Sequence, residues 1–187
     1  FPNTYFANLE DKGKFNVLES VKNEVLLMFY PEKASQNNQN IDKFGASDVL
    51  DLNWVQLMNA YSCTECGRCS SECPANMTGK KLSPRKIMMD TRDRLEKVSK
   101  NIAKNKGKFI DDGDRLLDNY ISKEELWACT SCNACVEACP INIDPLSIIM
   151  DMRQYLIMEE SSAHPDLNNM MNNIENNGAP WPYNQQD

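Results

Sequence analysis

The chain has 187 residues, of which 41% are hydrophobic and 25% are charged, with a formal net charge of −7. This length and composition suit one ordinary domain with a short arm, and they exclude a chain that is disordered throughout. No stretch approaches the roughly 20 apolar residues that a membrane-spanning helix needs. The acidic balance and the absence of a recognition motif also exclude nucleic acid as the expected partner.

The chain opens with Phe1-Pro2-Asn3, without a methionine and without a charged-then-apolar signal segment. We therefore expect it to be a soluble or peripheral piece of a longer protein.

Charge is distributed unevenly along the sequence. Between Lys80 and Lys108 there are eleven basic and three acidic residues, a local net charge of +8, whereas the other residues carry a net charge of −15. Such a segment is either a solvated helix face or a docking surface for an acidic partner or anionic headgroups. In the second case Arg92, Arg94 and Lys97 are the residues expected to contribute to docking.

Apolar residues recur at helical spacing, and alternation with period two is almost absent, so we predict an all-α fold. A first helix is expected over residues 20–30, where Pro31 ends it, and a polar connector over residues 35–40 separates this arm from the rest. After the connector, Ser47 is predicted to cap a helix whose apolar residues run from Val49 to Met58.

The later helices carry clear start and stop signals. A last apolar stripe over residues 167–174 precedes Gly178, which can form a C-terminal cap. The helix after residue 83 is expected to continue toward Gly107. Three helix starts have a capping residue: these are Ser83-Pro84, Ser122 with Glu125, and Asp144-Pro145.

All eight cysteines fall into two runs that share the spacing C-x2-C-x2-C-x3-C-P, and none is left over. Such a run lets one tight loop wrap three corners of an iron-sulfur cube, which needs four thiolates. The two runs are Cys63, Cys66, Cys69 and Cys73, and then Cys129, Cys132, Cys135 and Cys139.

Two [4Fe-4S] clusters are the predicted cofactors. Structural zinc is the alternative, but zinc sites typically use two separated pairs of ligands, and two complete four-cysteine runs would be an unusual way to build them. Disulfides are disfavoured because cysteines spaced by two residues bridge poorly and nothing in the sequence suggests secretion.

An internal repeat relates the two halves of the chain. Residues 83–92 match residues 144–153 at an offset of 61, whereas the cysteine runs match at an offset of 66. We therefore predict two pseudo-symmetric halves, each built as helix, cluster loop and helix. The expected organisation is an N-terminal arm and linker over residues 1–40, a two-cluster domain over residues 41–160, and a C-terminal helix and tail over residues 161–187.

The pseudo-symmetry predicts that each run sends its fourth cysteine to the other cluster, as occurs in two-cluster ferredoxins. Local ligation, in which each run serves its own cluster, is the alternative. In the crossed arrangement, cluster one is held by Cys63, Cys66, Cys69 and Cys139, and cluster two by Cys129, Cys132, Cys135 and Cys73.

These features resemble a known family. The two runs, the long helical insertion between them and the Ser83-Pro84 and Asp144-Pro145 helix starts look like the α-helical ferredoxin module of heterodisulfide-reductase-related iron-sulfur oxidoreductases. Residues 1–5, 51–56 and 176–182 look like bacterial membrane-bound (Fe-S)-binding proteins of that family.

The resemblance implies a module that relays single electrons through two [4Fe-4S] clusters within a respiratory or quinone-linked oxidoreductase. It implies a redox partner protein, such as a subunit with a Cys-Cys-Gly domain, and a membrane cytochrome b-like domain or subunit. The module itself is expected to be cytoplasmic, at the inner face of the cell membrane. The alternative is the iron-sulfur subunit of a heterodisulfide reductase- or glycolate oxidase-type enzyme. No catalytic residue is expected, since eight cysteines fill eight ligand positions and leave no open iron site for a substrate.

Three further residues invite functional interpretation. His164 is the only histidine, and its place beside Pro165 near a helix start favours a surface or capping role over haem or quinone ligation. Tyr61 and Trp127 each lie two residues before a first cysteine, where packing over a cluster is favoured over an obligatory electron path.

Overall fold

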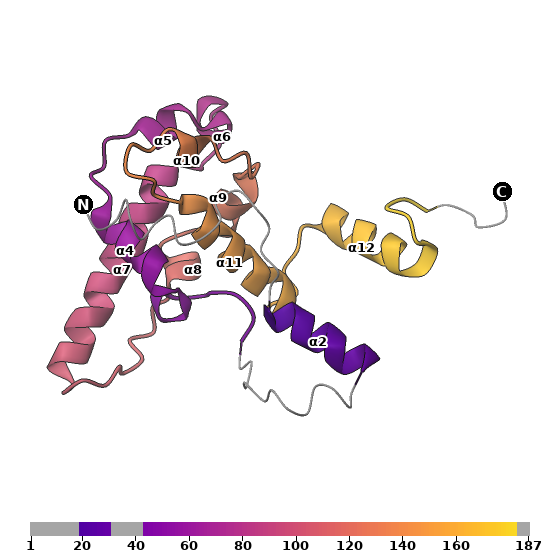
Figure 1. Ribbon diagram of the computed structural model, residues 1–187, viewed down its shortest axis with the longest axis horizontal. Helices are drawn as coiled ribbons and strands as arrows, with labels where there is room; N and C mark the ends of the chain where they lie inside the picture. The colour runs from indigo at the N-terminus through magenta and orange to yellow at the C-terminus, as the bar shows by residue number, and fades with distance from the viewer. Residues whose placement is uncertain (1–18, 31–42, 183–187) are drawn as a thin grey trace.

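The computed structural model describes residues 19–30 and 43–182, and its ordered elements are helices (Figure 1). Within these residues the only β-type pairing is an isolated bridge between Leu117 and Ile121. The predicted all-α fold is confirmed. The helices are α2 (Glu19–Phe29), η1 (Val49–Asp51, a 3-10 turn), α4 (Trp54–Ser62), α5 (Arg68–Ser71), α6 (Pro74–Met77), α7 (Pro84–Lys104), α8 (Leu116–Asn119), α9 (Lys123–Ala128), α10 (Ala134–Glu137), α11 (Pro145–Met158) and α12 (Pro165–Asn177).

The two predicted halves are present. Helices α4 and α9 each end at the residue before a first cysteine, and α5 and α10 each contain a third cysteine. The long helices α7 and α11 follow the two runs and begin at Pro84 and Pro145. Helix α6 lies in the longer connection of the first half, so the difference between the offsets of 61 and 66 corresponds to an additional short helix.

The core forms where α7 and α11 pack against each other and against α4. Ile87 and Met88 of α7 and Ile148 and Met152 of α11 are each at most 1% exposed. The chain before α4 also packs closely on α11, because Ala46 donates a backbone hydrogen bond to Asp151 O at 3.0 Å. The helices that flank the two cysteine runs therefore share one hydrophobic core.

Most helix starts were predicted correctly from capping residues. Ser83 accepts a hydrogen bond from Lys86 N, and Ser122 and Glu125 form the expected capping box. The Asp144 side chain accepts from two backbone N–H groups at the start of α11. Gly178, at φ +68°, ends α12.

The predicted cap at Ser47 is wrong. Asp48 caps the short η1 helix instead, and Asn53 starts α4 after a break at Leu52. Asn53 accepts a hydrogen bond from Gln56 N, while the Gln56 side chain accepts from Asn53 N. This reciprocal pair satisfies two backbone donors at the start of α4, and for this reason the helix begins there.

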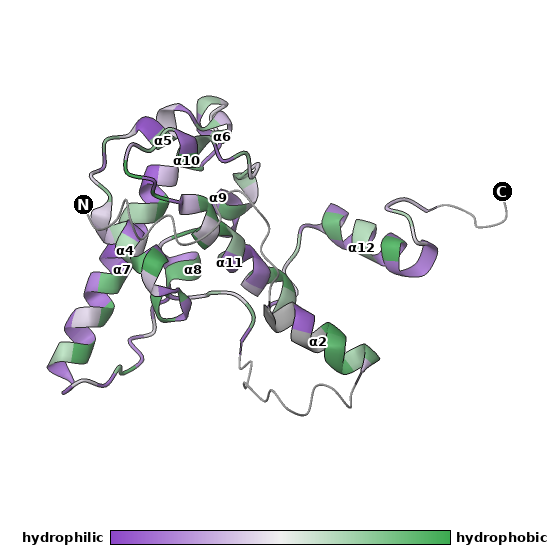
Figure 2. Ribbon diagram, in the orientation of Figure 1, coloured by the Kyte–Doolittle hydropathy of each residue, from purple (hydrophilic) through white to green (hydrophobic). Residues whose placement is uncertain are grey.

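Two terminal helices lie outside this core. Figures 1 and 2 show α12 apart from the remaining helices and α2 projecting away from the end of α11, with the C-terminal part of α2 strongly hydrophobic. Met28 and Phe29 of α2 are 78% and 66% exposed, and α12 has no buried residue. Among the described residues, no helix has both the length and the apolar character needed to cross a membrane.

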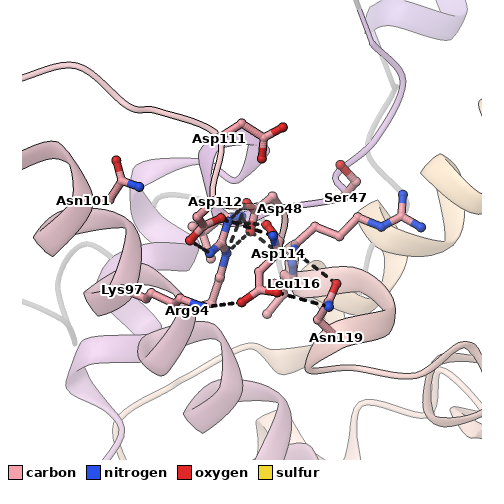
Figure 3. A network of polar contacts seen from close by, with 12 residues as sticks. Ser47, Asp48, Arg94, Lys97, Asn101, Asp111, Asp112, Asp114, Leu116 and Asn119 are labelled. Carbon is pink, nitrogen blue, oxygen red and sulfur yellow. Dashed lines mark hydrogen bonds and ion pairs between the residues drawn. The ribbon is translucent and has the colours of Figure 1, made fainter. Parts of the chain in front are cut away.

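Six of the eleven basic residues over residues 80–108 form ion pairs. Arg92 pairs with Glu65, Lys97 pairs with Asp114, and the Arg94 side chain is completely buried. Figure 3 shows Arg94 surrounded by acidic partners that come from two other segments of the chain. Arg94 therefore cannot contribute to a docking surface, and the expectation for this residue is wrong.

Candidate metal centre

The two cysteine runs lie side by side at one end of the molecule, where α5 and α10 contact each other (Figure 1). Each of these short helices starts from a residue in the left-handed region, Gly67 at φ +82° and Asn133 at φ +60°. Glycine adopts this conformation freely, and asparagine is one of the few other residues that tolerate it. The equivalent backbone turns give the two cysteine loops the same local shape.

The first loop encloses a hollow that the second loop completes. Its lining includes three cysteines of the first run, Cys63, Cys66 and Cys69, and two from the second, Cys135 and Cys139. The Cys139 thiol also interacts electrostatically with the thiols of Cys63 and Cys69. The fourth cysteine of the second run therefore lies close to the first run.

The reverse relationship holds for the fourth cysteine of the first run. Cys73, which is 6% exposed, interacts electrostatically with Cys129 and Cys135. Cys66 and Cys132, the second cysteines of the two runs, are the most exposed of the eight. None of the eight cysteines forms a disulfide.

The surroundings of several of these thiols favour the neutral form over the thiolate, unless a cation lies nearby. Burial raises the pKa of Cys63, Cys69 and Cys129, and it raises the pKa of Cys135 to about 12. Metal ions stabilise the deprotonated thiol that binds them. A group of partly buried thiols that raise one another's pKa values is therefore a donor set suited to a thiolate-bound metal centre.

Backbone donors also point at the sulfur atoms. Ser131 N lies 3.4 Å from Cys129 Sγ, and Ile143 N lies 3.4 Å from Cys139 Sγ. Hydrogen bonds of this kind stabilise thiolate ligands and tune cluster potentials. In the described part of the chain, no group of three or more His, Cys, Asp or Glu side chains is arranged to hold a single metal ion. In a [4Fe-4S] cube each thiolate binds a different iron, so the thiolates stand farther apart than around one ion.

The comparison with protein families agrees with this geometry. Residues 62–143 match the family described as the 4Fe-4S dicluster domain. The chain is an electron-transfer iron-sulfur module. The matched region contains both cysteine runs, and the eight cysteines fit two [4Fe-4S] clusters, as predicted.

Similar proteins are iron-sulfur oxidoreductases or ferredoxins. A probable iron-sulfur-binding oxidoreductase, FadF, from Bacillus subtilis is 27% identical over 213 residues, covering 99% of this chain and 28% of that protein. An EtfAB:quinone oxidoreductase from Syntrophomonas wolfei is 29% identical over 163 residues, covering 78% of this chain and 23% of that protein. A probable membrane-anchored ferredoxin from Chromohalobacter salexigens is 34% identical over 135 residues, covering 64% of this chain and 20% of that protein.

This chain therefore spans between a fifth and three tenths of the length of these relatives. The predicted resemblance to iron-sulfur oxidoreductases is confirmed for the module itself. One of these relatives is named for redox chemistry between EtfAB and quinone, and another is named a probable membrane-anchored ferredoxin.

Sequence reasoning did not identify two arginines at the site. Arg92 interacts electrostatically with Cys63, and Arg153 does so with Cys129. The sequence does contain a signal for this pair, because Arg92 and Arg153 occupy equivalent positions in the repeat with the offset of 61.

The three residues that invited functional interpretation have ordinary structural surroundings. His164 caps α12, where its Nδ1 accepts a hydrogen bond from Asp166 N at 3.4 Å, so the predicted capping role is confirmed. The Trp127 ring lies 5.0 Å from the Arg153 guanidinium, and Tyr61 is 51% exposed.

Proposed function

We propose that this module relays single electrons through two [4Fe-4S] clusters with crossed ligation, within a quinone-linked oxidoreductase. The observation that carries the ligation proposal is the reciprocal placement of the fourth cysteines. Cys139 interacts with Cys63 and Cys69, and Cys73 interacts with Cys129 and Cys135. In this proposal Cys66 and Cys132 complete the two sets of four ligands.

When bound, the clusters supply one-electron redox chemistry, over potentials that range from about −700 to +450 mV among iron-sulfur proteins. The chain itself contributes the ligand geometry and the surroundings of each cluster. The buried residues Met88 of α7 and Pro145 of α11 line the hollow at the first loop, whereas Cys66 and Cys132 are exposed. The proposed routes for electrons into and out of the module pass these two exposed edges.

The wider context is also part of the proposal. One relative is named as a quinone oxidoreductase and another as a membrane-anchored ferredoxin. Quinones are lipid-soluble, so an oxidoreductase that uses them works at a membrane surface. We place this module at the cytoplasmic face of the cell membrane, with a redox partner that has a Cys-Cys-Gly domain and a membrane cytochrome b-like domain or subunit.

The proposed division of the chain follows the same reasoning. Residues 41–160 form the two-cluster domain and contain the 4Fe-4S dicluster match over residues 62–143. Residues 1–40 and 161–187 flank it as an arm with a linker and as a C-terminal helix with a tail.

Alanine variants of matched cysteines test the ligation, with protein prepared without oxygen and examined by electron paramagnetic resonance after reduction. Crossed ligation predicts that Cys73→Ala and Cys132→Ala perturb the same cluster signal. It also predicts that Cys139→Ala and Cys66→Ala perturb the other signal. If Cys73→Ala instead reproduces the loss seen with Cys66→Ala, ligation is local and the crossed arrangement is wrong.

The acceptor is tested with the full-length protein in membrane vesicles. The clusters are first reduced chemically and the excess reductant is removed. Transfer of their electrons to an added short-chain quinone, which takes two electrons and two protons from solution to become the quinol, is then expected, and it should fall to background in the Cys66→Ala variant. If the quinone stays oxidised while a disulfide acceptor or a glycolate-type substrate couple exchanges electrons, the quinone-linked proposal is wrong and the alternative class of enzyme is supported.

A further inference from the structure

The two halves of the module differ in the fixed charge beside each first cysteine. Arg92 in α7 and Arg153 in α11 occupy equivalent positions in the repeat. Arg92 interacts electrostatically with Cys63, and Arg153 with Cys129. An equivalent arginine therefore lies next to each cluster-binding loop.

In the first half the arginine is neutralised. Arg92 Nη2 lies 2.5 Å from Glu65 Oε1, which makes a close ion pair. Glu65 lies between Cys63 and Cys66, at φ +59°. The positive charge of Arg92 and the negative charge of Glu65 thus lie together beside the first loop, and their effects on a cluster there largely cancel.

In the second half a serine stands at the position that corresponds to Glu65. Ser131, at φ +56°, follows Cys129 by two residues, as Glu65 follows Cys63. The same backbone turn is therefore present, but the carboxylate is replaced by a hydroxyl group. Arg153 Nη1 lies 3.5 Å from Ser131 Oγ.

Arg153 makes its other contacts with neutral groups. Arg153 Nη2 donates to Leu126 O at 2.6 Å and to Cys129 O at 2.5 Å, and the guanidinium lies over the Trp127 ring. No ion pair in the described part of the chain joins Arg153 to a carboxylate. Arginine remains protonated in proteins, so a full and partly buried positive charge persists beside Cys129.

A nearby positive charge favours the reduced form of a cluster, because reduction adds one negative charge. We propose that Arg153 raises the reduction potential of the cluster bound by Cys129, and that Glu65 prevents Arg92 from doing the same to the cluster bound by Cys63. This inference rests on the proposed two-cluster relay. It holds for crossed and for local ligation, because Cys63 and Cys129 belong to the same clusters in both arrangements.

The consequence for function is a bias in the direction of electron flow. The difference between Glu65 and Ser131 favours transfer from the first cluster to the second. Other charges also lie near the clusters: Arg68 and Arg85 are exposed beside the first loop, and the Asp144 carboxylate interacts with Cys135. These three groups are unchanged in the variants described below. Differences in midpoint potential between the variants therefore report only the charges around Arg92 and Arg153.

The experiment measures midpoint potentials of the iron-loaded protein by redox titration, with the two cluster signals followed by electron paramagnetic resonance. Glu65→Gln should raise one potential, since the charge of Arg92 is then balanced only by the longer pair with Asp93, in which Nε and Oδ1 lie 3.8 Å apart. Ser131→Glu and Arg153→Gln should each lower the other potential. We expect at least a tenfold change in the equilibrium constant for reduction, which is 59 mV for a one-electron couple.

Two controls separate charge from packing. Arg153→Lys retains the positive charge and should keep the potential close to that of the unaltered protein, even though several hydrogen bonds are lost. Lys81→Gln changes the net charge by the same unit as Arg153→Gln, but Lys81 lies on the surface in an exposed pair with Glu124 and should leave both potentials in place.

The inference is overturned if Glu65→Gln and Arg153→Gln leave both potentials unchanged, shift the same signal, or shift the signals in the opposite directions. In any of these cases, the proposed relay still stands if the protein shows two cluster signals that titrate. Failure of the relay itself would appear differently, as the absence of a second signal in the unaltered protein.

Discussion

Arg94 and Asp48, 46 positions apart in the sequence, form a two-pronged ion pair in which Arg94 Nη2 lies 2.6 Å from Asp48 Oδ2 and Arg94 Nε lies 2.9 Å from Asp48 Oδ1 (Figure 3). Asp48 also caps η1 and accepts a hydrogen bond from Leu116 N. A second carboxylate, that of Asp112, pairs with the same guanidinium. One buried arginine thus joins α7, the segment that leads into α4, and the loop before α8.

Replacing Arg94 is expected to destabilise the protein strongly. Arg94→Met leaves the carboxylates of Asp48 and Asp112 unpaired, and breaking a buried ion pair costs about 3–5 kcal/mol. Arg94→Lys should recover little, because a lysine cannot reproduce the planar two-pronged contact. The free energy of unfolding from urea denaturation is the measurement.

Lys97→Met is the matched control for this prediction, since Lys97 is one turn away on α7 and pairs with Asp114 at the exposed surface. Its midpoint of denaturation should stay close to that of the unaltered protein. Equal losses for Lys97→Met and Arg94→Met would show that the buried network has no special role in stability.

The same network predicts how stability responds to acid. The hydrogen bond from Arg94 lowers the pKa of Asp112 below the ordinary value of an aspartate. A carboxyl group whose pKa is lower in the folded protein contributes stability above its unfolded pKa, about 3.9, and this contribution is lost as the pH falls through the folded pKa. Asp112→Asn should therefore be less stable than the unaltered protein at pH 7, and the difference should shrink below about pH 4.

Thermal unfolding followed by circular dichroism at a series of pH values measures this difference. Asp111→Asn is the matched control, because the Asp111 carboxylate accepts a backbone hydrogen bond from Gly113 and forms no ion pair with Arg94. A difference between Asp112→Asn and the unaltered protein that stays constant from pH 7 to pH 3 would contradict the prediction.

Gly45 is predicted to be essential for the packing of the segment before η1 onto α11. A Cβ atom at this position would lie 2.3 Å from Asp151 O and 2.5 Å from Tyr155 N, which are backbone atoms of α11, and the φ angle of +72° also disfavours other residues. Gly45→Ala should therefore cause a large loss of stability, measured as a lower temperature of unfolding.

Gly79→Ala separates the two causes, because Gly79 has a similar φ of +77° but no atom within 4 Å of an added Cβ. Similar losses for the two variants would mean that backbone strain, and not the contact with α11, accounts for the effect.

Local signals in the sequence predicted most of the helices and the cofactor. Ser83, Ser122 and Asp144 act within one turn of their own position, so a capping residue identifies a helix start without knowledge of the fold. The cysteine spacing is equally local, since three ligands of a cube come from one short loop. The same local signals recur in both halves of the sequence, and this repeat predicted the pseudo-symmetry of the two halves.

Features that depend on distant parts of the chain could not be predicted in the same way. Arg94 looked like one charge of a basic surface, because its partners Asp48 and Asp112 come from segments that only the fold brings together. The cap predicted at Ser47 failed for a different reason. Asp48 caps η1 one position later, and Asn53 with Gln56 caps α4 six positions later. Which of several neighbouring residues becomes the cap depends on backbone geometry that composition does not reveal.

Removal of iron is expected to unfold much of the core. Protein prepared without oxygen should contain about eight irons and eight inorganic sulfides per chain, because two filled cubes hold four of each. With crossed ligation, the clusters would tie together Cys73 and Cys129, which are 56 positions apart. Iron chelation under reducing conditions should thus lower the helical circular dichroism signal together with the visible absorbance near 400 nm. The packing of α4, α7 and α11 against one another also stabilises the fold without iron. If the apo-protein keeps its full helical signal and unfolds at the same temperature as the iron-loaded protein, this hydrophobic core alone holds the two halves together and the prediction is wrong.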